Sequence, residues 1–291
     1  MDPGDRRQRL YPGLLFDLRR PQRNLQENTV TETPMISAHR SGAENDLARE
    51  NKLETLHRAA ELGCDFIEFD VHATADGHFV LNHDEFIREG ALTHQLREMT
   101  LSRIRELLPD VTTLAECLDA IKGHAKAHVD LKFTSPEDAY HHPESTLEVR
   151  ATEVVLQEMG ADGCIITTLE DRSVLAVRDW ADSMGINLLV GLSLGRDLSG
   201  AGAVQKLKVR LSELFPAQRI RNCRANLLVA NKDLARLTLH RFAARRGIPL
   251  LVWTVDEEAD LTFWLGKPDT WLVTTNFPKR ALRLRHEAAG G

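Results

Sequence analysis

The chain has 291 residues, of which 42% are hydrophobic and 27% are charged, with a formal net charge of −6. That length is enough to bury a large core, as one large domain or two small ones. The negative charge argues against a protein that binds nucleic acid or anionic membrane in bulk, and an aromatic content of 5% disfavours a base-stacking platform.

The first segment of the chain does not look like part of a folded core. Residues 1–23 are rich in arginine and are interrupted by proline and glycine, without the uninterrupted apolar segment of a signal peptide. No apolar run in the chain approaches the roughly 20 residues that span a bilayer. We therefore expect residues 1–33 to form a tail or docking arm, residues 34–288 to form one domain, and no integral membrane segment.

From residue 35 onward, short apolar segments alternate with longer amphipathic ones. The expected strands are 35–38, 65–72, 127–133, 164–168, 187–193, 226–230, 250–255 and 271–275, with a short extension at 78–82. The expected helices are 50–62, 101–108, 114–122, 146–159, 172–184, 203–214, 234–246, 257–265 and 279–287. Eight strand-then-helix units in about 250 residues predict a (β/α)8 TIM barrel. A doubly wound open sheet is disfavoured because no glycine-rich dinucleotide fingerprint follows the first strand.

Two carboxylates lie on one face of the second predicted strand. Glu68 and Asp70 are two residues apart between apolar neighbours, so both side chains point to the same side. Two desolvated carboxylates repel each other unless a positive charge lies between them, and a divalent cation such as Mg²⁺ or Ca²⁺, bound through oxygen, supplies it. His39 and His83 each follow a short apolar segment, where barrel enzymes place reactive groups.

The order of these motifs carries more information than any one of them. From the N-terminus it reads His39-Arg40, Glu50-Asn51, Glu68-x-Asp70-Val71, Thr74-x-Asp76-Gly77, His83-Asp84, Asp130-Leu131-Lys132, Trp253-Thr254-Val255-Asp256 and Thr274-Thr275-Asn276-x-Pro278. The set spans residues 35–278 and resembles the glycerophosphodiester phosphodiesterase family. That family consists of phospholipase C-like TIM barrels with a divalent-metal site.

The resemblance implies a role for each candidate site residue. It implies Glu68, Asp70 and Asp130 as ligands of Mg²⁺ or Ca²⁺, and His39 and His83 as the general base and general acid. Arg40 and Lys132 would neutralise the substrate phosphate. Arg40 would do so through its planar guanidinium group, and Lys132 through the single charge of its ammonium group. Two further residues are candidates for the pocket, namely Glu50 and Trp253.

The sequence also departs from the family pattern. Asp130 stands where the family carries Glu. Because the Asp side chain is shorter, Asp130 could bind the metal either directly or through a water molecule. Ser41 replaces the usual Gly after His-Arg, and we expect a tighter turn because serine disfavours positive φ. Asp256 and Asn276 exchange the family's Asn and Asp.

Basic residues near the expected mouth of the barrel point to an anionic group on the substrate. These are Arg49 and Lys52, which flank the Glu50-Asn51 motif.

The favoured function is hydrolysis of a glycerophosphodiester, derived from deacylated phospholipid or a related small diester, to sn-glycerol 3-phosphate and an alcohol. One alternative is a phospholipase D-like lyase that stops at a cyclic phosphate, and another is a catalytically silent binding barrel. The expected partner is a small phosphodiester, and the sequence leaves the oligomeric state open.

The four cysteines, Cys64, Cys117, Cys164 and Cys223, form no paired motif, so we expect reduced and mostly buried thiols in a cytoplasmic protein.

Overall fold

The computed structural model describes residues 33–289, and eight parallel strands form a barrel at its centre. The strands are β1 (Met35–Ala38), β2 (Phe66–Ala73), β6 (Lys126–Leu131), β7 (Cys164–Thr168), β8 (Leu189–Leu194), β9 (Leu227–Asn231), β10 (Leu250–Trp253) and β11 (Leu272–Thr275). β1 pairs with both β11 and β2, which closes the ring. The predicted TIM barrel is therefore confirmed. The predicted tail, apart from Thr33, lies outside the described residues.

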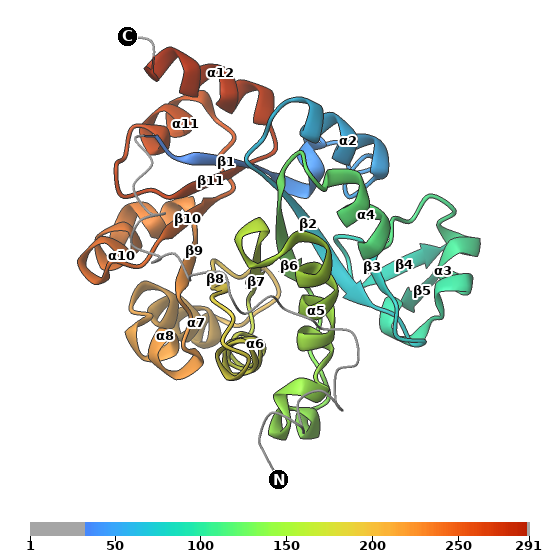
Figure 1. The fold of residues 1–291 in the computed structure, drawn as a ribbon. Helices are drawn as coiled ribbons and strands as arrows, with labels where there is room; N and C mark the ends of the chain where they lie inside the picture. The colour runs from blue at the N-terminus through green and yellow to red at the C-terminus, as the bar shows by residue number, and fades with distance from the viewer. Residues whose placement is uncertain (1–32, 290–291) are drawn as a thin grey trace.

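The helices surround the strands, as Figure 1 shows. They are α2 (Leu53–Glu61), α3 (Leu101–Leu107), α4 (Leu114–Ile121), α5 (Leu147–Met159), α6 (Asp171–Ser183), α7 (Ala203–Leu214), α8 (Ala217–Cys223), α9 (Lys232–Leu234), α10 (His240–Arg246), α11 (Glu258–Leu265) and α12 (Pro278–Ala289). A π-helical segment, η7 (Ala235–Leu239), joins α9 to α10, so the single helix expected at 234–246 is interrupted. In residues 33–289 no helix is long and apolar enough to cross a bilayer.

Two features of the fold were not expected from the sequence. After β3 (Phe79–Leu81), which is antiparallel to β2, the chain forms a separate hairpin of β4 (Phe86–Glu89) and β5 (Leu92–Gln95). α8 also falls in a segment with no predicted element. The hairpin packs over its own small core, formed by Val80, Leu96, Met99, Ile104 and Val111.

The core is divided between the two sides of the barrel wall. A large cluster lies between strands and helices, and a small one fills the barrel interior, made of Phe66, Ile165, Leu227, Val229, Leu251, Trp271 and Leu272. Most members of the small cluster lie in the first two residues of their strands or just before them. They therefore fill the amino-terminal half of the barrel and leave the carboxyl ends for polar side chains.

The strand register brings the acidic residues together. β2 and β6 are paired so that Asp70 lies opposite Asp130, and Asp130 in turn lies opposite Thr167 of β7. Glu68 lies two residues before Asp70, on the same face of β2. Because parallel strands end at one edge, these side chains converge at the carboxyl end of the barrel.

Candidate active site

A cavity of about 350 Å³ opens at the carboxyl ends of the strands. It is lined by His39, Arg40, Glu68, His83, His128, Asp130, Lys132, Thr167, Leu169, Ser193, Gly195, Arg196, Asp197, Val229, Trp253 and Thr274. Seven of the nine residues singled out in the sequence are among them. The other two, Glu50 and Asp70, lie behind the wall and hold residues that line it.

Three carboxylates form an acidic cluster at this wall, and one of them, Asp70, lies just behind it. Glu68, Asp70 and Asp130 each offer one oxygen, and these three atoms lie within 4.8 Å of one another. Lys132 Nζ lies 3.0 Å from Asp70 Oδ1 and 2.5 Å from Asp130 Oδ2. Burial alone would lower the pKa of Lys132, but the charges of Asp130 and Asp70 raise it above its ordinary value, so the ammonium is retained.

The charge of this cluster fits a divalent cation. With Glu50, the carboxylates carry four negative charges. Lys132 and Arg40 return two positive charges, and Arg40 Nε lies 3.6 Å from Asp70 Oδ2. Two negative charges remain uncompensated in a largely buried site. Burial and the neighbouring Asp70 raise the pKa of Glu68. Oxygen donors of this number and charge suit Mg²⁺ or Ca²⁺.

Asp70 is fixed from behind by Asn51. The Asn51 amide donates to Asp70 Oδ2 at 3.0 Å, and its oxygen accepts the Asp70 backbone N–H at 3.1 Å. Burial would raise the pKa of Asp70, yet the positive charges of Lys132 and Arg40 outweigh burial and lower it. Asp70 is therefore held as a carboxylate in one orientation. The Glu50-Asn51 motif could have indicated the contact between Asn51 and Asp70, but this contact was not predicted.

Arg40 is anchored by two carboxylates. Its backbone N–H donates to Glu68 Oε2 at 2.6 Å, and its Nη1 donates to both oxygens of Glu50 at 3.0 Å. The turn that carries it is left-handed, with φ of 45° at Arg40 and 66° at Ser41. The expectation that serine would remove positive φ is therefore wrong. The surrounding contacts enforce a conformation that costs a non-glycine residue about 1–2 kcal/mol.

His39 is held in one tautomer by a chain of hydrogen bonds. The Asn276 amide N–H donates to Asp256 Oδ2 at 2.8 Å, so the Asn276 oxygen faces His39 Nδ1, at 2.7 Å. Nδ1 must therefore carry the proton and Nε2 the lone pair. Nε2 lies 3.9 Å from Glu68 Oε2. Burial, and next the charge of Arg40, lower the pKa of His39 to about 4, so the ring is neutral near pH 7.

His83 reaches the cavity from the loop after β3 and is more exposed than His39. Its Nδ1 lies 2.8 Å from Asp84 Oδ1, which leaves Nε2 as the other exchangeable position. His72 lies behind it, with Nε2 3.4 Å from the His83 carbonyl oxygen. His72 does not line this cavity and supports the backbone that carries His83.

His128 was not singled out from the sequence, but it lines the cavity. Its ring nitrogens contact Ser37 Oγ at 3.1 Å and Thr167 Oγ1 at 3.2 Å. Burial lowers the pKa of His128 to about 3, so the ring is neutral. A lone histidine in an apolar strand has no sequence signal that separates a cavity residue from a core one.

Three buried polar atoms on the cavity-lining residues have no hydrogen-bond partner within residues 33–289. They are Nε of Arg40, Nε1 of Trp253 and Oγ1 of Thr274. Buried donors without acceptors are rare in folded proteins, and each costs about 1–3 kcal/mol. A ligand rich in oxygen atoms would satisfy them.

The cavity continues toward α5 and α6. A second space of about 350 Å³ shares Asp130, Lys132, Leu169 and Arg196 with the first. Arg196 Nη2 donates to Glu170 Oε1 at 2.6 Å, which fixes the guanidinium between the two spaces.

The basic residues expected at the mouth do not reach either space. Arg49 pairs with Glu54 at 3.2 Å and Lys52 pairs with Asp110 at 2.8 Å.

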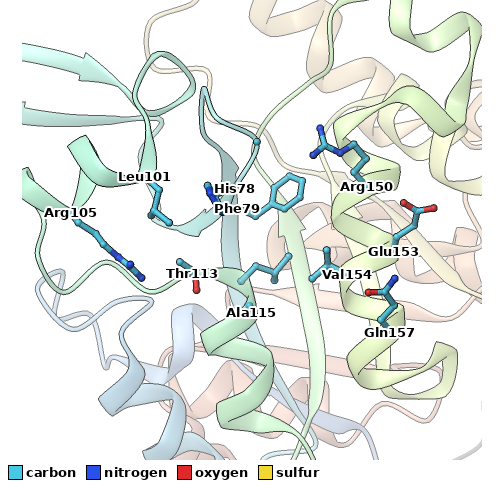
Figure 2. A pocket seen from close by; sticks show the side chains of 12 residues that line it. His78, Phe79, Leu101, Arg105, Thr113, Ala115, Arg150, Glu153, Val154 and Gln157 are labelled. Carbon is cyan, nitrogen blue, oxygen red and sulfur yellow. The ribbon is translucent and has the colours of Figure 1, made fainter. Parts of the chain in front are cut away.

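A larger cavity, of about 510 Å³, lies elsewhere, between α3, α4 and α5 (Figure 2). It contains none of the nine candidate site residues. Figure 2 shows Arg105, Arg150 and Glu153 around it. Arg105 is already paired with Glu116 at 3.1 Å. The carboxylate cluster and the three cavity histidines, His39, His83 and His128, lie at the barrel mouth instead, which makes the mouth the candidate active site.

Known proteins with this barrel and similar sequence are phosphoric diester hydrolases, and this chain is one of them. It belongs to the Glycerophosphoryl diester phosphodiesterase family, whose model matches residues 39–279.

Three similar proteins illustrate the match. A glycerophosphodiester phosphodiesterase of Caldanaerobacter subterraneus is 26% identical over 245 residues, covering 78% of this chain and 88% of that protein. The structure of a glycerophosphodiester phosphodiesterase from Parabacteroides distasonis has a TM-score of 0.66 at 18% identity, covering 88% and 98% of the two chains. A phosphodiesterase from Oleispira antarctica, solved with the product sn-glycerol-3-phosphate, has a TM-score of 0.63 at 17% identity, covering 87% and 97%.

Proposed function

We propose that this protein hydrolyses a small glycerophosphodiester to sn-glycerol 3-phosphate and an alcohol, using His39 and His83 as acid–base catalysts. The observation that carries the proposal is a set of three buried polar atoms without a hydrogen bond, on Arg40, Trp253 and Thr274, beside the carboxylate cluster. A phosphate with adjoining hydroxyl groups offers acceptors and donors to all three. The product bound in the Oleispira antarctica phosphodiesterase is such a molecule.

A divalent cation belongs to the proposed site. Glu68, Asp70 and Asp130 would hold Mg²⁺ or Ca²⁺, and the two uncompensated negative charges of the cluster support a doubly charged ion. When bound, such an ion withdraws charge from the phosphate and lowers the pKa of an oxygen next to it.

His39 is the proposed general base. Its Nδ1 proton is committed to Asn276, so Nε2 can accept a proton from the attacking oxygen. That oxygen belongs either to water or to a neighbouring hydroxyl of the substrate. As a new P–O bond forms, the proton moves from the nucleophile to Nε2. General base catalysis of this kind contributes about 10²–10⁴ in rate.

His83 is the proposed general acid. With Nδ1 bound to Asp84, Nε2 gives its proton to the oxygen of the departing alcohol as the old P–O bond breaks. The proton taken by His39 and the proton given by His83 balance over one turnover, because water returns both rings to their starting states.

Arg40 and Lys132 would stabilise the negative charge that builds up on the phosphate oxygens. Arg40 is held in place through Glu50 and Glu68, and its Nε lies 3.6 Å from Asp70 Oδ2 without a hydrogen bond. Lys132 keeps its positive charge because it lies between Asp70 and Asp130. Donors that are fixed before the substrate arrives need no reorganisation during the reaction.

A lyase that ends at a cyclic phosphate is the second candidate, since related lyases also use Asp as the third acidic ligand and Asp130 stands in that place here. The two functions are separated by their products. Phosphorus NMR of the reaction with glycerophosphocholine or glycerophosphoethanolamine should show glycerol 3-phosphate, formed only when Mg²⁺ or Ca²⁺ is present and lost with EDTA. A cyclic phosphate that persists after the substrate is consumed would reject the hydrolase.

Two variants separate cation binding from proton transfer. Glu68→Ala should lose both calorimetric binding of the cation and turnover. His83→Ala should retain cation binding and lose turnover, most strongly on substrates with poor leaving groups. Near wild-type rates for His83→Ala on those substrates would show that the general-acid assignment is wrong. If the wild-type protein bound no cation and hydrolysed no diester, it would be a catalytically silent binding barrel.

A further inference from the structure

The helix α7 exposes an apolar stripe to solvent. Val204, Leu207 and Leu211 recur at helical spacing with Phe215 directly after the helix, and their exposed fractions are 69%, 61%, 47% and 68%. Leu237 of η7, 65% exposed, lies close by, since the Thr238 hydroxyl donates to the Leu214 carbonyl at 3.0 Å. We call Val204, Leu207, Leu211, Phe215 and Leu237 the α7 ridge. Contiguous exposed apolar side chains of this kind mark interaction sites.

The charges on α7 are almost all positive. The helix carries Lys206, Lys208 and Arg210, and its one acidic residue, Glu213, is buried and paired with Arg210 at 2.6 Å. Neither lysine forms an ion pair with another residue of the described range 33–289. Lys208 is four residues after Val204 and three before Leu211, so its ammonium lies next to the ridge. The ridge is therefore apolar with a basic border.

The ridge is connected to the reaction cavity by one buried carboxylate. Glu213 Oε1 accepts the backbone N–H groups of Gly195 and Arg196, at 2.8 and 2.9 Å. Both of these residues line the cavity. The segment that carries these two cavity residues is therefore fixed to α7. Figure 1 shows α7 and α8 on the outside of the barrel next to β8 and β9.

Two occupants from within the protein are disfavoured by charge. A symmetric second copy would bring Lys206 and Lys208 of both chains to the same interface, and like charges there are costly. The segment 1–23 contains apolar residues, but it has six arginines against three aspartates, so it carries the same sign as α7. The occupant must offer both an apolar interior and negative charge.

We propose that the α7 ridge docks on the surface of a bilayer that contains anionic lipids. The apolar side chains would enter the headgroup region while the lysines contact lipid phosphates, as in amphipathic interfacial helices. The chain as a whole has a net charge of −6, so the basic border of the α7 ridge sets it apart from the average surface of the protein. The inference goes beyond the proposed function and is tested without measuring activity.

The test is flotation of the full-length protein with vesicles of phosphatidylcholine, with and without phosphatidylglycerol. Wild type should float with the vesicles that contain phosphatidylglycerol, and less so at high salt. The double variant Leu207→Glu/Leu211→Glu should reduce the bound fraction about tenfold or more, because it puts two charges where two leucines would be buried in the bilayer. Lys206→Glu/Lys208→Glu should reduce it too and remove the salt dependence.

Leu92→Glu is the matched control, since Leu92 on β5 is 62% exposed and outside the ridge. It should float like wild type, and all variants should keep the wild-type melting temperature because the changed side chains are exposed. Equal flotation of wild type and Leu207→Glu/Leu211→Glu would overturn the proposal. The proposal would also be overturned if wild type did not float with either kind of vesicle. The same holds if wild type is a dimer in sedimentation velocity and Leu207→Glu/Leu211→Glu is a monomer.

Discussion

The amide oxygen of Asn276 accepts the Nδ1 proton of His39 at 2.7 Å, across 237 residues of sequence. The orientation of the amide is fixed because its N–H group donates to Asp256 Oδ2 at 2.8 Å. A carboxylate can only accept, so the amide cannot be reversed without losing that bond. Asp256 thus determines, through Asn276, which nitrogen of His39 carries the lone pair.

Asn276→Ala should therefore reduce kcat far more than it changes KM, because the ring of His39 can then adopt the wrong tautomer or rotate. We expect a loss on the order of 10²-fold, within the range of general base catalysis. Steady-state kinetics of Asn276→Ala, Asp256→Ala and the double variant measure this. Since the two residues act as one chain, the double variant should be no worse than the poorer single variant. Fully additive losses would contradict the chain.

Removal of the divalent cation should destabilise the folded protein. The three carboxylates of the cluster then face only Lys132 and Arg40, and the remaining buried negative charge is repulsive. Addition of Mg²⁺ or Ca²⁺ to EDTA-treated protein should raise the melting temperature, with about 2.7 kcal/mol gained at a free concentration of one hundred times Kd. Glu68→Gln should show a much smaller increase, and an unchanged wild-type melting temperature would argue against the site.

Glu148 of α5 should be one of the most sensitive positions for stability. Its fully buried carboxylate accepts hydrogen bonds from Ser173 Oγ at 2.7 Å, the Ser135 backbone at 3.2 Å, and the hydroxyls of Ser135 and Tyr140. Glu148→Ala removes the carboxylate that accepts all four bonds and leaves buried donors to share the Tyr140 hydroxyl, so we expect a loss of about 3–5 kcal/mol in urea unfolding.

Glu158, on the same helix, provides the comparison. It forms an exposed ion pair with Lys122 at 2.9 Å, so Glu158→Ala should cost less than about 1 kcal/mol. Similar losses at the two positions would mean that the Glu148 network contributes no more than a surface pair.

Cys164 should make the protein less stable at high pH. Burial raises the pKa of its thiol from 9.0 to about 12, so above pH 9 the unfolded chain releases a proton that the folded chain retains. The unfolded state then binds fewer protons, and the free energy of unfolding falls as pH rises from 9 to 12. Cys164→Ala should remove one proton from this dependence, about 1.4 kcal/mol per pH unit. Equal slopes for wild type and variant, in urea titrations between pH 9.5 and 11, would refute it.

Much of the fold could be predicted because buried parallel strands are recognisable in sequence. β7, covered on both faces, has the bounds expected from its apolar run, and β1 does too. The hairpin of β4 and β5 could not be predicted, because each strand has four residues and is largely exposed. Such short strands lack the apolar alternation that distinguishes them from loops.

The candidate site was also predictable only in part. Seven of the nine candidate residues predicted from the motifs line one cavity, because most of them lie near the carboxyl ends of strands, and these ends meet in a barrel. Bonds between side chains far apart in the sequence, such as Asn51 to Asp70 and Asn276 to His39, depend on strand register and ring closure. The exchange of Asp256 and Asn276 was visible in the sequence, but its effect on a tautomer was not.

The closure of the barrel has a consequence for the timing of activity. His39 follows β1, the first strand, and Asn276 follows β11, the last, and the two strands are hydrogen-bonded neighbours. The hydrogen bond that sets the tautomer of His39 therefore lies at the seam between the first and the last strand of the barrel. The proposed metal ligands, with Arg40 and Lys132, all precede residue 133, so a growing polypeptide contains them well before β11 can close the ring. The proposed general base would therefore obtain its working tautomer only after the ring has closed.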